Sequence, residues 1–215
     1  VMILAQEIIV DPSSYPTEKI TKNAYEFREL GLGYANLGAL LMALGIPYDS
    51  EEARHTAGAI TAVMCGEAYR YSAEISRRIG SFGGFEVNRE PTLEVIATHR
   101  DATHRIRKNR VFDEKLHQAA LRVWEDAVAL GRKYGVRNSQ VTVIAPTGTI
   151  SFMMDCTTTG IEPEFALVKM KHLVGGGTMR FTNPIVAKGL KKLGYSEEEI
   201  AAITDHMEKN ETIEG

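Results

Sequence analysis

The chain has 215 residues, of which 44% are hydrophobic and 25% are charged, values typical of a soluble globular protein with one large domain or two small ones. Its net charge of -3 argues against nucleic-acid and membrane-surface binding, because both usually require a basic excess. No apolar run approaches the roughly 20 residues that cross a bilayer, so we expect no membrane-spanning segment.

Cysteine usage and the chain ends bound the protein class further. Cys65 and Cys156 are the two cysteines, and they form no Cys-x-x-Cys motif. This argues against a disulfide framework, a zinc site or a dithiol redox centre, and it indicates a reducing cytoplasm. The sequence starts at Val1 and stops at Gly215 in mid-pattern, so we expect a segment of a longer chain, truncated at both ends.

Apolar spacing and end signals predict most of the helices. Residues 11–19 have turn composition, with Thr17 as a candidate N-cap, and Gly31 and Gly33 suggest a tight turn. Asp113 is the candidate cap of a helix that Gly135 ends. In chain order, the predicted helices cover residues 39–44, 51–79, 91–105, 114–134, 183–193 and 196–209.

Strands are predicted between these helices. Residues 140–145 are apolar on both faces, as in a central parallel strand that helices cover. Residues 166–174 and 179–182 are further strand candidates, separated by a glycine turn at 175–177. Strands interleaved with helices favour an α/β fold.

The stretch APTGTISF, residues 145–152, follows the predicted strand and carries three hydroxyl side chains. A strand that passes through such a turn into a helix presents unpaired N–H groups and the positive end of the helix dipole, which suit an anion. Thr147, Thr149 and Ser151 would add hydroxyl donors, and Gly148 would let a phosphate approach the backbone. The alternative is a capped helix without a ligand, with Thr149 or Ser151 as the cap.

The longer pattern around this turn is similar to a known family. RNSQVTVIAPTGTISFMMDCTTTGIEPEFALVKMKHLVGGG resembles the catalytic-domain segment of the ribonucleotide reductase large chain, and MMDCTTTGIEP resembles its adenosylcobalamin-dependent, class II branch. EFRELGLGYANLGALLMALGIPYDSEEAR, AQEIIVDPSSYPTEKI and the closing TIEG are also similar to this family. The resemblance therefore covers nearly the whole chain.

The resemblance implies a fold and a binding loop. The family's catalytic domain is a helix-rich, ten-stranded α/β barrel of two parallel halves, and residues 1–215 would form most of the second half as a partial barrel domain. The family's PTxxxS-type loop holds the substrate phosphates. Its counterparts here are Pro146, Thr147, Gly148, Thr149, Ile150 and Ser151.

The resemblance also implies the chemistry of the complete enzyme, the reduction of a ribonucleoside di- or triphosphate to its 2′-deoxy form. Adenosylcobalamin would generate a cysteine thiyl radical, a thioredoxin-like thiol would supply electrons, and the enzyme could be a homodimer. The family's radical-cysteine block and reducing cysteine pair are not in this sequence, so we expect no catalytic residue in this segment and no turnover by it alone. The alternatives are a class I large chain and a non-catalytic phosphate- or nucleotide-binding module.

Other conspicuous residues have simpler interpretations. Glu162 is the carboxylate that we expect to support the loop beside the substrate, ahead of Asp155. Cys156 is expected to pack rather than react, and Asn138 is expected to serve a turn. The histidines form no ligand cluster, and the basic connector at 105–110 is expected to be solvated.

Overall fold

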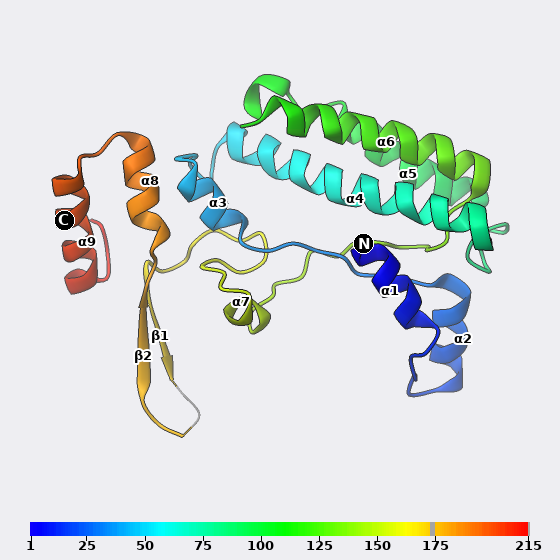
Figure 1. The fold of residues 1–215 in the computed structure, drawn as a ribbon, viewed down its shortest axis with the longest axis horizontal. Helices are drawn as coiled ribbons and strands as arrows, with labels where there is room; N and C mark the ends of the chain where they lie inside the picture. The colour runs from blue at the N-terminus through cyan, green and yellow to red at the C-terminus, as the bar shows by residue number, and fades with distance from the viewer. Residues whose placement is uncertain (173–174, 215) are drawn as a thin grey trace. The chain divides into compact units, whose positions relative to one another are not determined.

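The computed structural model describes residues 1–172 and 175–214, without the side chains of residues 171, 172, 179 and 181. The chain divides into two compact units (Figure 1). The first comprises Val1–Gly33 and Arg54–Ile144, and the second comprises Tyr34–Ala53 and Ala145–Gly215.

The first unit is helical. Two predicted caps are confirmed: the Thr17 hydroxyl accepts a hydrogen bond from the Ile20 N–H at 3.3 Å, and Asp113 accepts one from the Lys115 N–H at 2.8 Å. Of the first two helices, the sequence patterns indicated only the N-cap, Thr17. The helices are α1 (Met2–Val10), α2 (Glu18–Phe27), α4 (Glu51–Ile79, whose first residues belong to the second unit), α5 (Arg89–Thr103), the 3₁₀ turn η1 (Lys108–Arg110) and α6 (Glu114–Tyr134).

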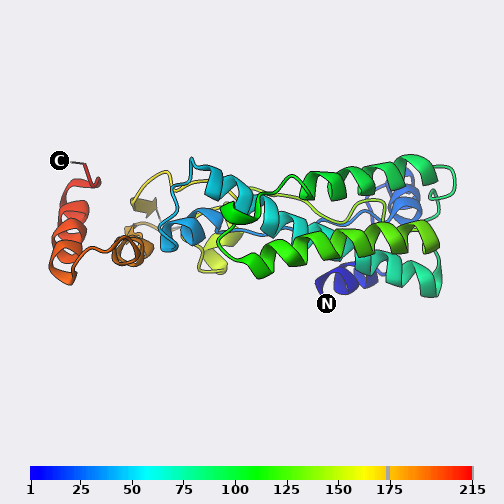
Figure 2. The same ribbon diagram turned by 90° about the horizontal axis from the view of Figure 1, so that it is seen from above.

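Helices α4, α5 and α6 lie side by side and enclose the main apolar core (Figures 1 and 2). Trp124 of α6 is fully buried in it, with Phe85 and Ile96. Gly66 of α4 allows the close packing, because a Cβ there would lie 2.7 Å from Val123. The long helices predicted from apolar spacing are thus confirmed.

A buried polar network connects α1 to distant parts of the same unit. The Glu7 carboxylate accepts hydrogen bonds from Arg28 Nε at 2.6 Å, Arg137 Nε at 2.7 Å and Asn138 Nδ2 at 2.5 Å. Asn138 Oδ1 in turn accepts from the Ser72 hydroxyl at 2.8 Å. Asn138 is fully buried, so the expectation of a simple turn role for it was wrong.

The predicted central strand at 140–145 forms only a short parallel pairing. Leu32 and Thr142 form an isolated bridge, and the Leu30 N–H donates to the Gln140 carbonyl. Val141 is buried, but Val143 and Ile144 are exposed. A central strand pairs with a neighbouring strand along both of its edges. Within the described residues, the segment 140–145 pairs along one edge, with residues 30–32.

The tight turn predicted at Gly31 and Gly33 is absent, because both glycines lie in the segment that pairs with residues 140–143. A Cβ on Gly33 would lie 2.3 Å from the Val143 carbonyl oxygen. These glycines therefore serve close approach of two backbones rather than a change of direction.

The second unit combines short helices with one hairpin. Helix α3 packs on α8, and α8 packs on α9. Ser196 and Glu199 form a capping box at the start of α9. The elements are α3 (Leu37–Ala43), α7 (Ile150–Met153), β1 (Val168–His172), β2 (Thr178–Thr182), α8 (Ile185–Leu193) and α9 (Glu197–Asn210).

The two strands pair antiparallel, with Val168 opposite Thr182 and Met170 opposite Arg180. The strand predicted at 166–174 extends at its end into residues 173–174, which lie outside the described residues. Because β1 and β2 pair antiparallel, this pair does not show the parallel arrangement expected from the family. The described residues form no closed barrel, and the expectation of ten strands is not confirmed; the α/β assignment holds only as a helix-rich fold with little sheet.

Candidate phosphate-binding turn

The stretch APTGTISF forms a compact turn in the second unit. Thr147 adopts a left-handed conformation, with a φ of 55°, which reverses the chain. Its carbonyl accepts a hydrogen bond from the Ser151 N–H at 2.9 Å, and α7 follows. The turn therefore carries its own internal hydrogen bonds.

Two of the three hydroxyl groups bond to each other. The Thr147 and Ser151 hydroxyls lie 2.9 Å apart in a hydrogen bond, and the Gly160 N–H donates to Thr147 Oγ1 at 2.8 Å. Ser151 is buried and lines the cavity beside the turn. These two hydroxyls therefore hold the turn together, and their contact with a ligand stays a prediction. Thr149 is exposed and its hydroxyl makes no hydrogen bond to another described residue.

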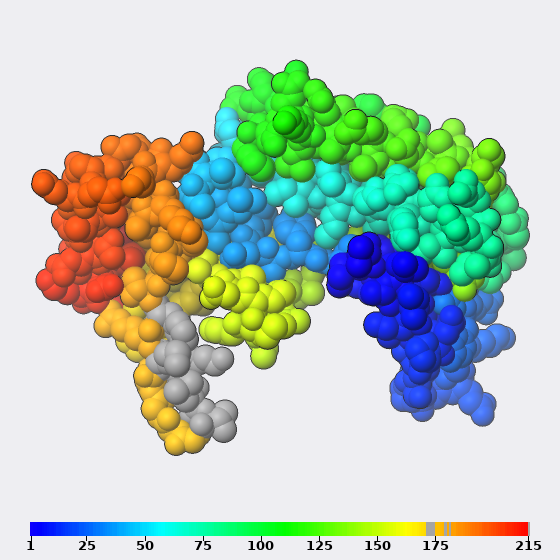
Figure 3. Space-filling view, in the orientation of Figure 1, coloured from blue at the N-terminus to red at the C-terminus, as the bar shows by residue number. Residues whose placement is uncertain are grey.

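Three successive backbone amides of the turn have no hydrogen-bond acceptor among the described residues. Gly148, Thr149 and Ile150 are exposed, and none of their N–H groups donates to another described residue. A Cβ on Gly148 would meet no atom within 4 Å, so the space in front of this residue is open. Figure 3 shows the segment around α7 at the molecular surface. Since α7 has only four residues, its dipole is small, and any anion would be held by the amides themselves.

A segment behind the turn holds it in place; we name residues 157–160 the brace. Asn36 Oδ1 accepts hydrogen bonds from the N–H groups of Thr157 at 3.1 Å and Thr158 at 3.0 Å. Gly160 donates to the turn as described above, and a Cβ on it would lie 2.8 Å from the Ala145 carbonyl oxygen. Sequence patterns missed Asn36, because 121 residues separate it from Thr157.

A cavity of about 510 Å³ adjoins the turn. This volume is typical of small-molecule sites. The cavity is lined in part by Gly148, Ser151, Cys156, Glu164, Lys169 and Asn183. Lys169 and Glu164 form an ion pair of 2.7 Å inside it. The turn therefore lies beside space for the rest of a ligand.

The remaining candidate residues lie near the brace. Glu162 Oε2 accepts a hydrogen bond from the Thr159 hydroxyl at 3.3 Å, a contact suited to the supporting role expected for this carboxylate. Asp155 is exposed and follows α7. The Cys156 thiol is directed to the Met154 carbonyl at 3.8 Å.

The other polar candidates make local contacts. His104 pairs with Glu125, and His117 with the Ile106 carbonyl. His99 stacks on Trp124, and its burial lowers its pKa. In the basic connector, Lys108 pairs with Glu114. Among the described residues, no group of three or more potential metal ligands gathers, and no helix is both long and apolar enough to span a membrane.

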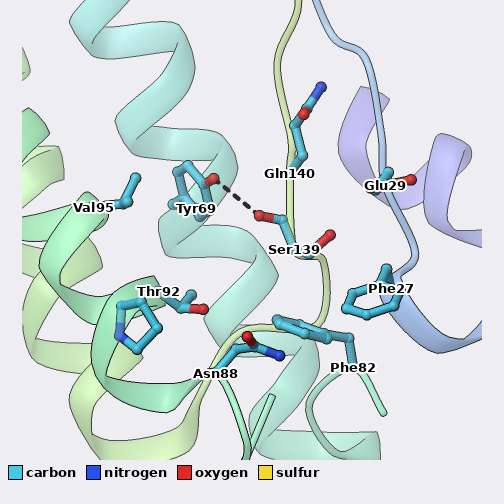
Figure 4. Close-up of a pocket in the computed structure, with 10 residues that line it drawn as sticks. Phe27, Glu29, Tyr69, Phe82, Asn88, Thr92, Val95, Ser139 and Gln140 are labelled. Carbon is cyan, nitrogen blue, oxygen red and sulfur yellow. Dashed lines mark hydrogen bonds between the residues drawn. The ribbon is translucent and has the colours of Figure 1, made fainter. Parts of the chain in front are cut away.

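Another cavity, of about 370 Å³, lies in the first unit (Figure 4). The Tyr69 hydroxyl donates to the Ser139 carbonyl at 3.4 Å at its wall. Burial, with a smaller effect of Cys65, raises the pKa of Tyr69 to about 12, so this hydroxyl remains a neutral donor. Glu29 is acidic and none of the described lining residues is basic, which disfavours an anionic ligand.

Comparison with known proteins identifies the family. The model of the family described as ribonucleotide reductase, barrel domain, matches residues 1–215. The chain is 51% identical to a vitamin B12-dependent ribonucleotide reductase of Rhodopirellula baltica over 99% of the chain and 20% of the relative. It is 47% identical to the protein of that name from Streptomyces coelicolor, over 99% of the chain and 22% of the relative.

A relative from Agrobacterium fabrum with the same name is 48% identical, over 92% of the chain and 17% of the relative. The chain thus spans about a fifth of the length of these relatives. Because the family match covers every residue of the chain, the chain belongs to the ribonucleotide reductase family and corresponds to its barrel domain.

Proposed function

We propose that this chain is part of the catalytic barrel of an adenosylcobalamin-dependent ribonucleotide reductase and that its turn at residues 146–151 binds the phosphates of the ribonucleotide. The observation that carries this proposal is that Gly148, Thr149 and Ile150 are exposed and that none of their N–H groups donates to another described residue. A capped helix without a ligand is the less favoured alternative, because Thr149, at the N-cap position, makes no side-chain capping hydrogen bond.

The energetics of such a site suffice without a bound cation. Hydrogen bonds from neutral amides to a charged phosphate contribute about 1.5–3 kcal/mol each. Three convergent amides would therefore contribute several kcal/mol to substrate binding. The open space in front of Gly148 leaves room for the phosphate oxygens.

The names of the relatives support the reaction that we propose. The Rhodopirellula baltica and Streptomyces coelicolor relatives are named vitamin B12-dependent ribonucleotide reductases. A Mycobacterium tuberculosis relative, 30% identical over 90% of the chain, is named a ribonucleoside-diphosphate reductase, which favours a diphosphate substrate. We assign residues 1–215 to the second half of the barrel in a longer cytoplasmic protein, which would also contain the radical and reducing cysteines and receive electrons from a thioredoxin-like protein.

Adenosylcobalamin would supply the radical that starts the reaction in the complete enzyme. We assign no cobalamin contact and no radical step to this segment.

The test replaces Gly148 with alanine in the complete protein that contains these residues. Gly148 has no left-handed φ, and its Cβ would meet nothing, so Gly148→Ala should leave the free energy of unfolding unchanged or raise it by about 0.4–1 kcal/mol. The same methyl group would stand where the phosphate approaches. The dissociation constant of a ribonucleoside diphosphate, measured by calorimetry, should therefore rise about tenfold or more, the equivalent of one lost charged hydrogen bond.

Gly58→Ala is the matched control, because a Cβ there makes only ordinary contacts of 3.6 Å or more. It should leave nucleotide binding unchanged. Unchanged binding in a stable Gly148→Ala protein would refute the assignment of the turn. Cobalamin-independent turnover by the complete protein would instead favour a class I enzyme, and absence of turnover with every cofactor would favour a non-catalytic nucleotide-binding module.

A further inference from the structure

Lys169 of β1 has an ammonium group that is held by several neighbours in the second unit. It forms an ion pair of 2.7 Å with Glu164 Oε1 and donates a hydrogen bond to the Thr157 carbonyl at 2.5 Å. It also lies 4.9 Å from the ring centre of Phe165. The ammonium group thus connects the hairpin to the first residue of the brace.

The partner carboxylate is itself fixed. The Glu164 side chain is only 4% exposed, and its second oxygen accepts a hydrogen bond from Asn183 Nδ2 at 2.6 Å. Asn183 Oδ1 accepts from the Ile185 N–H at the start of α8. Because each group in this series is held by the next, the position of the Lys169 ammonium is defined by α8 and the hairpin together.

The brace carries this constraint to the turn. Its first residue, Thr157, accepts from Lys169 through its carbonyl and donates to Asn36 through its N–H. Its last residue, Gly160, donates to Thr147 Oγ1 inside the turn. A shift of the brace would therefore move Thr147, the residue that directly precedes the amides of Gly148, Thr149 and Ile150.

We propose that Lys169 is a positioning residue for substrate binding, which acts through the brace to hold the amides of the turn in the orientation that a phosphate requires. This inference rests on the proposed function of the turn. Its physical basis is that hydrogen-bond donors to a ligand must be held within a fraction of an ångström by the groups behind them. Lys169 need not touch the substrate.

The experiment compares Lys169→Met, which keeps most of the stem and removes the ammonium, with Lys169→Arg in the complete protein. We expect Lys169→Met to raise KM for the ribonucleotide about tenfold with kcat nearly unchanged, because the turn contributes to ground-state binding. The inhibition constant of inorganic pyrophosphate, a probe with phosphate groups alone, should rise by a similar factor. Lys169→Arg should restore most of both values.

Lys188→Met is the matched control, since Lys188 is an exposed lysine of α8, and it should change neither constant. If Lys169→Met fails to fold, Lys169→Gln, which keeps a donor on a shorter stem, carries the same expectation. Unchanged KM and pyrophosphate inhibition in a folded variant would overturn the role of Lys169. The proposed function of the turn is tested separately: it fails if Gly148→Ala leaves nucleotide binding unchanged, whatever the result for Lys169.

Discussion

Glu7→Gln is the sharpest test of the polar network in the first unit. Glu7 accepts three hydrogen bonds, two from guanidinium groups, and its side chain is 5% exposed. Glutamine keeps one acceptor oxygen for Arg28 and Arg137, but it places an NH₂ group against the NH₂ of Asn138. That amide cannot simply flip, because Asn138 Oδ1 accepts from the Ser72 hydroxyl and Nδ2 also donates to the Arg28 carbonyl.

The expected loss is large for a single-atom change. Arg28 would keep an ion pair of 2.8 Å with Asp11, but Arg137 would lose its ion pair with Glu7. Removing one partner of a buried ion pair typically costs about 3–5 kcal/mol. For a chain of this size that corresponds to a fall in melting temperature of about 6–20 °C. The assay is urea and thermal unfolding of the 215-residue chain, followed by circular dichroism.

Glu18→Gln provides the control, since Glu18 is an exposed carboxylate at the start of α2. It should cost less than about 1 kcal/mol. A double-mutant cycle of Glu7→Gln with Arg137→Met should show strong coupling. A loss below about 1 kcal/mol for Glu7→Gln, with no coupling, would refute the view that this carboxylate neutralises the two arginines.

Two further predictions concern single residues in each unit. Gly160 has a φ of 48°, and a Cβ on it would clash with the Ala145 carbonyl oxygen. Gly160→Ala should therefore lower the free energy of unfolding, measured by urea titration, by at least about 1–2 kcal/mol and should weaken nucleotide binding. Unchanged stability and unchanged binding would contradict the packing of the brace against the turn. The pKa of His99 lies below its ordinary value of 6.5 because of burial, so its contribution to stability is full above pH 6.5 and falls as the pH decreases towards the folded-state pKa. Between pH about 7.5 and about 5, the free energy of unfolding should therefore change less with pH in His99→Gln than in the unmodified chain. An equal pH dependence of the two free energies would contradict this.

Local signals in the sequence predicted the helices well. Thr17 and Asp113 are caps in the structure, and the predicted boundaries of the 114–134 helix are those observed. These features depend on residues within a few positions of one another. Helix α1 was missed because it is apolar on several faces and has no side-chain cap.

Long-range features could not be predicted in the same way. The pairing of residues 30–32 with 140–143, and the bond from Asn138 to Glu7 across 131 positions, leave no local pattern. In the candidate site, the sequence indicated a turn with free amides, but it could not show that the hydroxyls of Thr147 and Ser151 bond to each other. Thr147 is also held by Gly160, which reaches it only in the folded chain.

The groups that we propose to hold the phosphate are main-chain N–H groups, which neither gain nor lose protons across the physiological range. Because they do not titrate, the pH dependence of binding should follow the ionisation of the ligand, with a transition near the second phosphate pKa of about 6. Binding should also tolerate exchange of side chains that neither enter the phosphate space nor hold the turn, since the recognising atoms are common to all residues except proline.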